Sequence, residues 1–389
     1  MFKFLNKILS NFDLNLYYGK NKSLEERNNI LKEIFEKLDL QIKFTDEVDN
    51  DTIYPICNLS NPWIHNKEVF SDELINYINN GLKVIIFNVN ETIREDAFEE
   101  FITYLKNKNI EEKNIYFLVN NWKIDLYKKK YNSNINYHNP IFLHKVHSEI
   151  LQANKVNFVK NKKFYFMCHN NKMWLHRYLM VSLLHYNNFL KDTDYSVINC
   201  DNYSSKHDDY LKKHANSSLH HVMLTDDELE KYSESFMFVK ELNNKRSYYE
   251  TNLESIDSNF IETKTFEQSF INIVNETDFD DKTIHITEKS LKPFYYYQYP
   301  IFVAPYEHCK YLRDYGFDFF DDIIDHSYDN EKNNKKRIFM IIEELIRIKD
   351  NIGFFKNNYS NFKSRFIKNQ KIVMDLVNLD NDKNYLKRL

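Results

Sequence analysis

Thr287, Glu288 and Lys289 stand at the start of a predicted helix, and their side chains suit an anionic ligand. Thr287 is a residue type favoured at the N-cap, and the apolar run at 299–304 that follows the helix is typical of a buried strand. The free N–H groups of a helix start and the Lys289 ammonium attract phosphates, whereas the Glu288 carboxylate can accept hydrogen bonds from ribose hydroxyls. The pattern indicates either a nucleotide site or an ordinary capped helix.

A second segment has a related pattern. Residues 164–168 form a short apolar run, a polar break with Asn170 and Asn171 follows, and residues 174–184 are apolar at helical spacing. This order predicts strand, turn and helix, with Arg177 one to two turns into the helix. There its guanidinium can fork onto a phosphate, or it can simply be a solvated arginine on an amphipathic helix.

Together the two segments resemble the donor-binding half of the α-1,3-fucosyltransferases and of related phage and bacterial glycosyltransferase-like proteins of the GT-B type. In that family a strand ends in an Asn-containing turn, an arginine follows in the next helix, and a Thr-Glu-Lys helix start comes later in the chain. Residues 311–329 are also similar to the phage-type members, and the likeness covers about residues 160–345.

The resemblance implies a transferase that moves a sugar from a nucleotide diphosphate donor to a hydroxyl acceptor. It needs no cofactor besides that donor substrate and no metal, because cationic side chains hold the diphosphate. Under it the donor-binding residues are Asn170, Asn171, Arg177, Thr287, Glu288 and Lys289, with Glu288 on the ribose and Lys289 on the diphosphate. Two alternatives remain, namely glycosylation of modified DNA bases by a phage enzyme and a non-catalytic module that binds a sugar or nucleotide.

Glycine is scarce in this chain, which excludes the commonest nucleotide-binding loops. Only 4 glycines occur, at positions 19, 81, 316 and 353, whereas about 7% is usual. A P-loop, a G-x-G-x-x-G fingerprint and a kinase-type glycine loop are therefore all absent from the sequence. Any phosphate must be held by helix ends and side chains.

The overall charge gives weak evidence against nucleic acid as a partner. The 53 basic and 57 acidic residues leave a net charge of −4, so no global field attracts nucleic acid or an anionic membrane. A duplex-binding protein usually presents a basic face. Nucleic acid stays possible as an acceptor, and no segment approaches the ~20 apolar residues that span a bilayer.

Metal and disulfide chemistry are not indicated by the spacing of the ligand residue types. The 4 cysteines, at positions 57, 168, 200 and 309, form no C-x-x-C pair, so we expect no disulfide framework or zinc site and infer a reducing cytoplasm. None of the 14 histidines forms an H-E-x-x-H motif. Asp278 and Asp280 have Asp-x-Asp spacing, which we assign to a loop rather than to a metal site.

The first half of the chain alternates strands and helices. Apolar runs at 51–57, 83–87 and 114–119 predict strands, and residues 68–80 and 95–106 predict helices, the first of which a glycine closes. Such alternation predicts a parallel sheet, whose ligands lie beyond the carboxyl ends of the strands.

Glu91 is the acid best placed for a general base in this half. It follows the predicted strand at 83–87 directly, and transfer to a hydroxyl needs a base on that hydroxyl. The alternative is an acid that leads the next helix and is stabilised by the helix dipole.

The second half repeats the alternation. Strands are predicted at 163–168, 195–200, 220–224, 283–286 and 299–304, loops or an insertion at 203–265, and helices at 332–350 and 354–378. We therefore predict an α/β fold of two Rossmann-like domains facing across a cleft, GT-B-like, with C-terminal helices.

The expected domain boundaries follow from this alternation. Residues 1–155 form the acceptor-side α/β domain, residues 156–355 the domain that binds the nucleotide-sugar donor, and residues 356–389 a helix packing back toward the first domain. Residues 1–12 place Phe4, Leu5 and further apolar side chains on one helical face, which predicts a short amphipathic helix.

Overall fold

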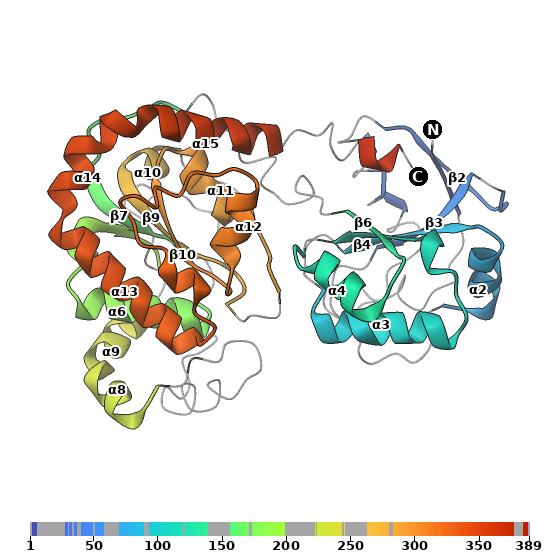
Figure 1. The fold of residues 1–389 in the computed structure, drawn as a ribbon, viewed down its shortest axis with the longest axis horizontal. Coiled ribbons are helices and arrows are strands. Elements are labelled where there is room, and N and C mark those ends of the chain that lie inside the picture. The colour runs from blue at the N-terminus through green and yellow to red at the C-terminus, as the bar shows by residue number, and fades with distance from the viewer. Residues whose placement is uncertain are drawn as a thin grey trace. The chain divides into compact units, whose positions relative to one another are not determined.

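The computed structural model describes most of the chain, in ranges separated by gaps. The described residues are 2–5, 28–29, 31–32, 35–36, 40–49, 51–57, 70–88, 93–119, 121–138, 156–170, 173–198, 222, 224–242, 245, 263–279, 283–376 and 384–387. The chain divides into two compact units (Figure 1). Unit 1 comprises Met1–His147, Lys282–His285 and Leu376–Leu389, and unit 2 comprises Ser148–Asp281 and Ile286–Asp375.

Unit 1 contains a parallel sheet of six strands in the order β2-β1-β3-β4-β5-β6. The strands are β1 (Phe2–Leu5), β2 (Ile42–Thr45), β3 (Thr52–Cys57), β4 (Lys83–Asn88), β5 (Ile115–Val119) and β6 (Asn136–His138). The predicted strands at 51–57, 83–87 and 114–119 are confirmed within a residue at each end.

The helices of unit 1 alternate with its strands along the chain. They are α2 (Asp72–Asn79), α3 (Glu95–Asn107) and α4 (Ile124–Tyr131), with the short 3-10 helix η1 (Glu112–Asn114). Ser71 caps α2 by accepting from the Leu74 N–H. Gly81 follows the C-cap of α2 with φ of 105°, a conformation that favours glycine, as the sequence predicts.

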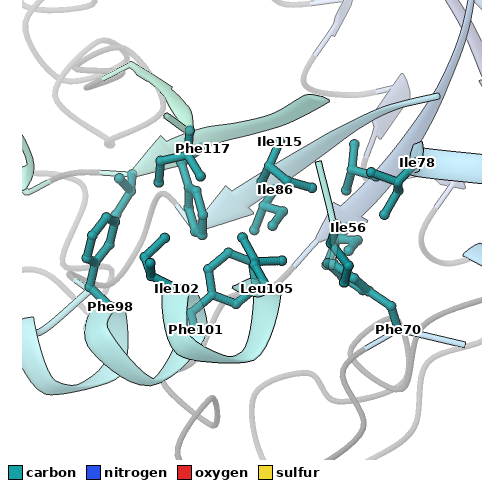
Figure 2. Packing of buried hydrophobic residues seen from close by; sticks show 14 of the residues in the cluster. Ile56, Phe70, Ile78, Ile86, Phe98, Phe101, Ile102, Leu105, Ile115 and Phe117 are labelled. Atoms are coloured by element: carbon teal, nitrogen blue, oxygen red, sulfur yellow. The ribbon is translucent and has the colours of Figure 1, made fainter. Parts of the chain in front are cut away.

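The core of unit 1 lies between the sheet and its helices (Figure 2). Ile86 and Phe117 project from β4 and β5 toward Phe101 and Leu105 of α3, and all four are buried. The rings of Phe101 and Phe117 meet edge to face with centroids 5.2 Å apart. Aromatic edge contacts of this kind add to the burial of apolar area in fixing α3 on the sheet.

The N-terminal prediction is wrong for the residues that the structure describes. Residues 2–5 form β1, which pairs in parallel with both β2 and β3. Phe4 and Leu5 are buried on opposite sides of the sheet, each in a different cluster of the core. A strand buried on both faces carries apolar side chains on successive residues, and a short run of this kind has no distinguishing period. Residues 6–12 lie outside the described ranges.

Unit 2 contains a parallel sheet of four strands in the order β10-β9-β7-β8. The strands are β7 (Phe164–Cys168), β8 (Thr193–Tyr195), β9 (Ser269–Asn275) and β10 (Tyr299–Val303). The predictions for β7 and β10 are confirmed. The chain is thus an α/β protein with a parallel sheet in each unit.

Two strand predictions in the second half of the chain are wrong, and a third falls mostly outside the described residues. The strand predicted at 195–200 is β8, which ends at Tyr195. Residues 283–286 are not a strand, and the carbonyl of Ile284 accepts instead from the Trp122 N–H at 3.0 Å. Of residues 220–224 the structure describes only two, neither of them in a strand.

β9 is the strand that the sequence analysis missed, and it lies in the centre of the sheet. Its seven residues are all buried, and it pairs with β7 on one side and β10 on the other. It is the strand that precedes α11 in the chain, a place for which the sequence predicts residues 283–286 instead. The run that forms β9 is Ser-Phe-Ile-Asn-Ile-Val-Asn, in which polar residues at both ends and in the middle hide a fully buried strand.

The helices of unit 2 surround this sheet. They are α6 (Leu175–Tyr186), α8 (Asp226–Lys231), α9 (Ser233–Glu241), α10 (Thr263–Glu267), α11 (Glu288–Tyr295), α12 (His308–Asp314), α13 (Asn334–Asp350), α14 (Ile352–Asn358) and α15 (Lys363–Leu376), with 3-10 helices η2 (Leu190–Asp192), η4 (Ser327–Asn330) and η5 (Tyr359–Phe362). The helices predicted at 174–184 and 332–350 are confirmed, and the one predicted at 354–378 is broken by η5.

For residues 203–265 the sequence predicted loops or an insertion, and the loop alternative is wrong where α8, α9 and the start of α10 lie. Among the described residues, no helix combines the length and the apolar character needed to cross a membrane.

Candidate functional site

Two neighbouring strands of unit 2 end side by side and feed polar loops. β7 ends at Cys168 and continues into His169, whereas β9 ends at Asn275 and continues into Glu276. Ligands of open parallel sheets lie beyond such carboxyl ends. The site is therefore expected where these loops meet the helices that follow them.

The predicted helix start at Thr287 is confirmed. The Thr287 hydroxyl accepts from the Lys289 N–H at 3.2 Å and caps α11, with Glu288 and Lys289 in its first turn. α11 then leads into β10, as the sequence predicts. Pro293 sits inside α11, in its last turn.

A pocket at this edge of the sheet collects three of the predicted donor residues. Its cavity volume is about 70 Å³, and it is lined by Met167, His169, Arg177, Phe266, Asn272, Ile273, Val274, Asn275, Glu288, Lys289 and Lys292. Arg177 of α6 and both Glu288 and Lys289 of α11 thus line the same cavity, although they are far apart in the sequence. A space of this size suits a small group rather than a whole nucleotide.

The lining of the pocket is cationic. Arg177, Lys289 and Lys292 contribute three positive charges, against one carboxylate from Glu288. Lys292 is 6% exposed and its ammonium lies 5.5 Å from the centroid of the Phe266 ring. Aromatic faces stabilise such a cation, and helix starts add partial positive charge. The combination suits an anion.

Arg177 is buried and anchored to the end of β9. Its Nε and Nη2 atoms donate to the main-chain oxygen of Glu276 at 3.2 and 2.8 Å, and His176 Nε2 donates to the same oxygen at 2.9 Å. Arg177 is 4% exposed, so it is no solvated surface arginine. Its fork is oriented by the protein before any ligand arrives.

Lys289 is held at the pocket by neutral and acidic oxygens. Its Nζ atom lies 3.3 Å from Thr287 Oγ1 and 3.4 Å from Thr277 Oγ1, and it pairs with the Glu288 carboxylate at 3.2 Å. Its side chain is 31% exposed and that of Glu288 is 21% exposed. The ammonium is accessible from the pocket and partly fixed in place.

Glu276 lies beneath this arrangement and was not predicted. Its side chain is fully buried, and its carboxylate accepts from Thr287 Oγ1 at 2.8 and 3.1 Å, from Ser290 Oγ and from the Thr277 N–H at 3.2 Å. Burial opposes ionisation, but the charge of Lys289 and the Ser290 hydrogen bond help to outweigh it and lower the pKa of the carboxyl. Glu276 is therefore a buried anion.

The direction of the hydrogen bonds around Ser290 follows from this charge. Because the Glu276 carboxylate can only accept, the Ser290 hydroxyl donates to it and accepts from Nε2 of His308 at 2.7 Å. In a hydrolytic triad the acid orients the histidine and the histidine activates the serine. Here the acid contacts the serine directly, and both Ser290 and His308 are fully buried, so the order does not suit nucleophilic catalysis.

The remaining predicted site residues lie elsewhere or outside the described ranges. Asn170 is 1% exposed, and its main chain joins the loop after β7 to Ser196 and Ile198 beyond β8. It is not among the residues that line the pocket. Asn171 and Glu91 fall outside the described residues.

No group of acidic, cysteine or histidine side chains in the described part of the chain is arranged to hold a metal ion. Asp278 lies in the loop after β9, and Asp280 is outside the described ranges. Burial raises the pKa of the Cys168 thiol to about 11, which keeps this thiol protonated and unreactive.

A larger cavity of about 830 Å³ lies in another part of unit 2. Arg313, Asp321, His326, Arg347 and Phe354 are among its lining residues, and none of the predicted site residues is. His326 Nε2 donates to the carbonyl of the second residue of β10 at 3.1 Å, so this cavity borders the amino end of that strand. Its charged groups form ion pairs with one another, such as Arg313 with Asp321 at 2.8 Å. The smaller pocket is the candidate site because it lies at the carboxyl edge of the sheet.

No protein-family model matches this sequence, and a search of curated proteins finds no match. Two of the solved structures that resemble the chain are enzymes that handle sugars. One is the DNA-modifying enzyme β-glucosyltransferase, solved in the presence and absence of the substrate uridine diphosphoglucose, with 10% identity, a TM-score of 0.30, and coverage of 97% of this chain and 99% of that chain. The other is a UDP-forming α,α-trehalose-phosphate synthase from Burkholderia xenovorans, with 9% identity, a TM-score of 0.33, and coverage of 92% of this chain and 81% of that chain.

Proposed function

We propose that the protein is a glycosyltransferase that moves a sugar from a nucleotide diphosphate donor to a hydroxyl acceptor. The observation that supports this most is the convergence of Arg177, Lys289 and Lys292 on one pocket at the carboxyl edge of the unit 2 sheet. Glu288, on the same pocket, is the carboxylate that accepts from the ribose hydroxyls.

Transfer of a sugar from a diphosphate requires positive charge near the leaving group, and the lining of this pocket is cationic. When the bond between the sugar and the diphosphate breaks, negative charge develops on the departing diphosphate. Arg177, Lys289 and Lys292 neutralise that charge, and the start of α11 adds to their effect. In this scheme one phosphate group of the diphosphate enters the pocket, while the rest of the donor extends beyond it because the cavity is small.

The proposal includes a GT-B arrangement with donor and acceptor held by different domains. The donor binds the domain of residues 156–355, and the acceptor binds that of residues 1–155, with the residues after Asp375 returning to the first domain. Glu91, which follows β4 in the sequence, is the proposed base on the acceptor hydroxyl. Asn170 and Asn171 stay proposed donor residues at the end of β7.

Binding and turnover of candidate donors test this function. We expect one of UDP, GDP, TDP, ADP or CMP to raise the melting temperature of the purified protein, and the corresponding nucleotide sugar to be hydrolysed slowly without acceptor. If the protein binds a nucleotide but releases none from any of the nucleotide sugars, even with glycan and modified-DNA acceptors supplied, it is a non-catalytic binding module. Binding of none of the five nucleotides would contradict the proposal altogether.

A further inference from the structure

Glu276 follows β9 and contacts residues of two helices, α6 and α11, that line the pocket. Its carboxylate accepts from Thr287 at the start of α11, and its main-chain oxygen accepts from Arg177 of α6. Its own N–H donates to the Val303 oxygen at 3.0 Å, which ties the end of β9 to the end of β10. One residue therefore contacts both cationic walls of the pocket without lining it.

We propose that Glu276 is a positioning residue, whose buried carboxylate fixes Thr287 and Lys289 for the diphosphate of the donor. The inference rests on the proposed function and adds a residue that acts through others. Glu276 itself is fully buried, and its side chain touches hydroxyl groups and a main-chain N–H rather than the pocket.

The carboxylate fits these contacts in a way that an amide does not. Thr287 and Ser290 both donate hydroxyl protons to it, and the Thr277 N–H donates a third. A glutamine has a single acceptor oxygen and an NH₂ group that can only donate. In the Glu276→Gln variant, either orientation of the amide leaves at least one of these buried donors without its acceptor, which is unfavourable in a dry interior.

The Thr287 hydroxyl links the Glu276 carboxylate to Lys289. It donates to Glu276 while it accepts from the main-chain N–H of Lys289 at 3.2 Å and lies 3.3 Å from the Lys289 Nζ. Fixing the proton of Thr287 on the carboxylate leaves its lone pairs directed at Lys289. The helix start and the ammonium are thereby held together at the pocket.

Glu276→Gln separates this role from simple electrostatics, because the two predict opposite signs. Removal of a negative charge near a cationic pocket should strengthen the binding of an anion. Loss of the positioning contacts should weaken it, by roughly tenfold for one charge-assisted hydrogen bond. The probe is inorganic pyrophosphate, which needs no knowledge of the nucleobase, titrated into the full chain well below its melting temperature.

The matched control is Glu343→Gln, the same chemical change on an exposed residue of α13. We expect it to bind pyrophosphate as the unaltered protein does. Glu276→Gln should bind it more weakly, and Glu276→Gln combined with Lys289→Ala should bind it no more weakly than the worse single variant, because both changes remove the same cation from its place.

The outcomes distinguish this inference from the proposed function. Unaltered or tighter binding in Glu276→Gln, or additive losses in the double variant, overturns the positioning role and leaves the donor site intact. No pyrophosphate or nucleotide binding by the unaltered protein contradicts the donor site itself. If Glu276→Gln does not fold, Thr287→Val replaces it, since it removes the hydroxyl that joins the carboxylate to Lys289 and leaves the charge. Unchanged pyrophosphate affinity in Thr287→Val then overturns the inference.

Discussion

Two guanidinium nitrogens of Arg177 donate hydrogen bonds to the main-chain oxygen of Glu276, at 3.2 and 2.8 Å. The contact spans from α6 to the residue directly after β9, so it fixes the helix that follows one strand to the end of the neighbouring strand. A planar fork directed at a single carbonyl also fixes the plane of the guanidinium. The cationic wall of the pocket is therefore rigid before a ligand binds.

Arg177→Lys should impair turnover although it keeps the charge. A lysine has no planar fork, so it cannot reproduce two donors to the Glu276 oxygen while it presents charge to the pocket. We expect kcat/KM for the donor sugar to fall by about tenfold or more. Arg347→Lys on α13 is the control, because that arginine also donates to a carbonyl, of Ile323, but borders the other cavity. Full activity in Arg177→Lys would show that this arginine contributes charge alone.

Lys289→Ala should weaken nucleotide diphosphate binding with the fold preserved. The side chain is 31% exposed at the first turn of α11, so its removal leaves no buried void. A charge-assisted contact contributes about 1.5–3 kcal/mol, which corresponds to roughly tenfold or more in Kd. Lys191→Ala, at an exposed position of η2, should bind as the unaltered protein does. The donor-site assignment is wrong if calorimetry gives the same Kd for Lys289→Ala and Lys191→Ala.

Lys292→Met tests the cation that the sequence analysis did not assign to the site. Methionine keeps an apolar stem against the Phe266 ring and removes the charge from the pocket. We expect weaker diphosphate binding and a shallower dependence of Kd on ionic strength, because one fewer cation faces the ligand. A Kd and a salt dependence equal to those of the unaltered protein would place Lys292 outside the binding surface.

The sequence predicted the chemistry-bearing helix start because local signals define it. Thr287 caps α11 through its own hydroxyl, and Lys289 follows in the first turn, so residue types alone locate both. Gly81, with its positive φ at the end of α2, was located in the same way. Such features depend on neighbours in the chain, which a single sequence displays.

Glu276 shows why the remaining residues of the site could not be predicted from the sequence. It follows β9, whose apolar residues are interrupted by polar ones, so the strand itself was not recognised. The side-chain amide of Asn272, in the middle of β9, donates a hydrogen bond to Gln298, 26 residues further along the chain. Gln298 in turn donates to the main-chain oxygen of Phe266. A buried carboxylate likewise depends on partners such as Ser290 that tertiary structure brings close. Without knowledge of those partners, polar residues in a sequence predict a loop.

His308→Gln should reduce the loss of stability at mildly acidic pH. Burial lowers the pKa of His308, against the opposing effect of Glu276 and Asp329, so the folded state resists protonation. Below the ordinary pKa of about 6.5 the unfolded chain binds a proton that the folded chain does not, and stability falls as the pH decreases. Glutamine keeps an N–H donor for Ser290 and does not titrate.

Urea unfolding between pH 8 and pH 5 measures this effect. The free energy of unfolding of the unaltered protein should fall more steeply below pH 6.5 than that of His308→Gln, with a difference of no more than one bound proton, or about 1.4 kcal/mol per pH unit. Parallel curves for the two proteins would mean that protonation of His308 does not lower the free energy of unfolding. His185→Gln is a suitable comparison, since that histidine is half-buried and bonds to Ser235.

Transfer should continue in excess EDTA. Arg177, Lys289 and Lys292 supply three positive charges where the diphosphate is proposed to depart, which is the task that Mg²⁺ or Mn²⁺ performs in metal-dependent transferases. Asp278 lies in the loop after β9, and Asp280 falls outside the described residues. The assay compares product formation from the donor sugar with and without EDTA, and then with Mn²⁺ added back. If EDTA abolishes transfer, Mn²⁺ restores it and Asp280→Asn prevents the recovery, the cationic clamp is not what stabilises the leaving group, and the GT-B assignment must be replaced together with it.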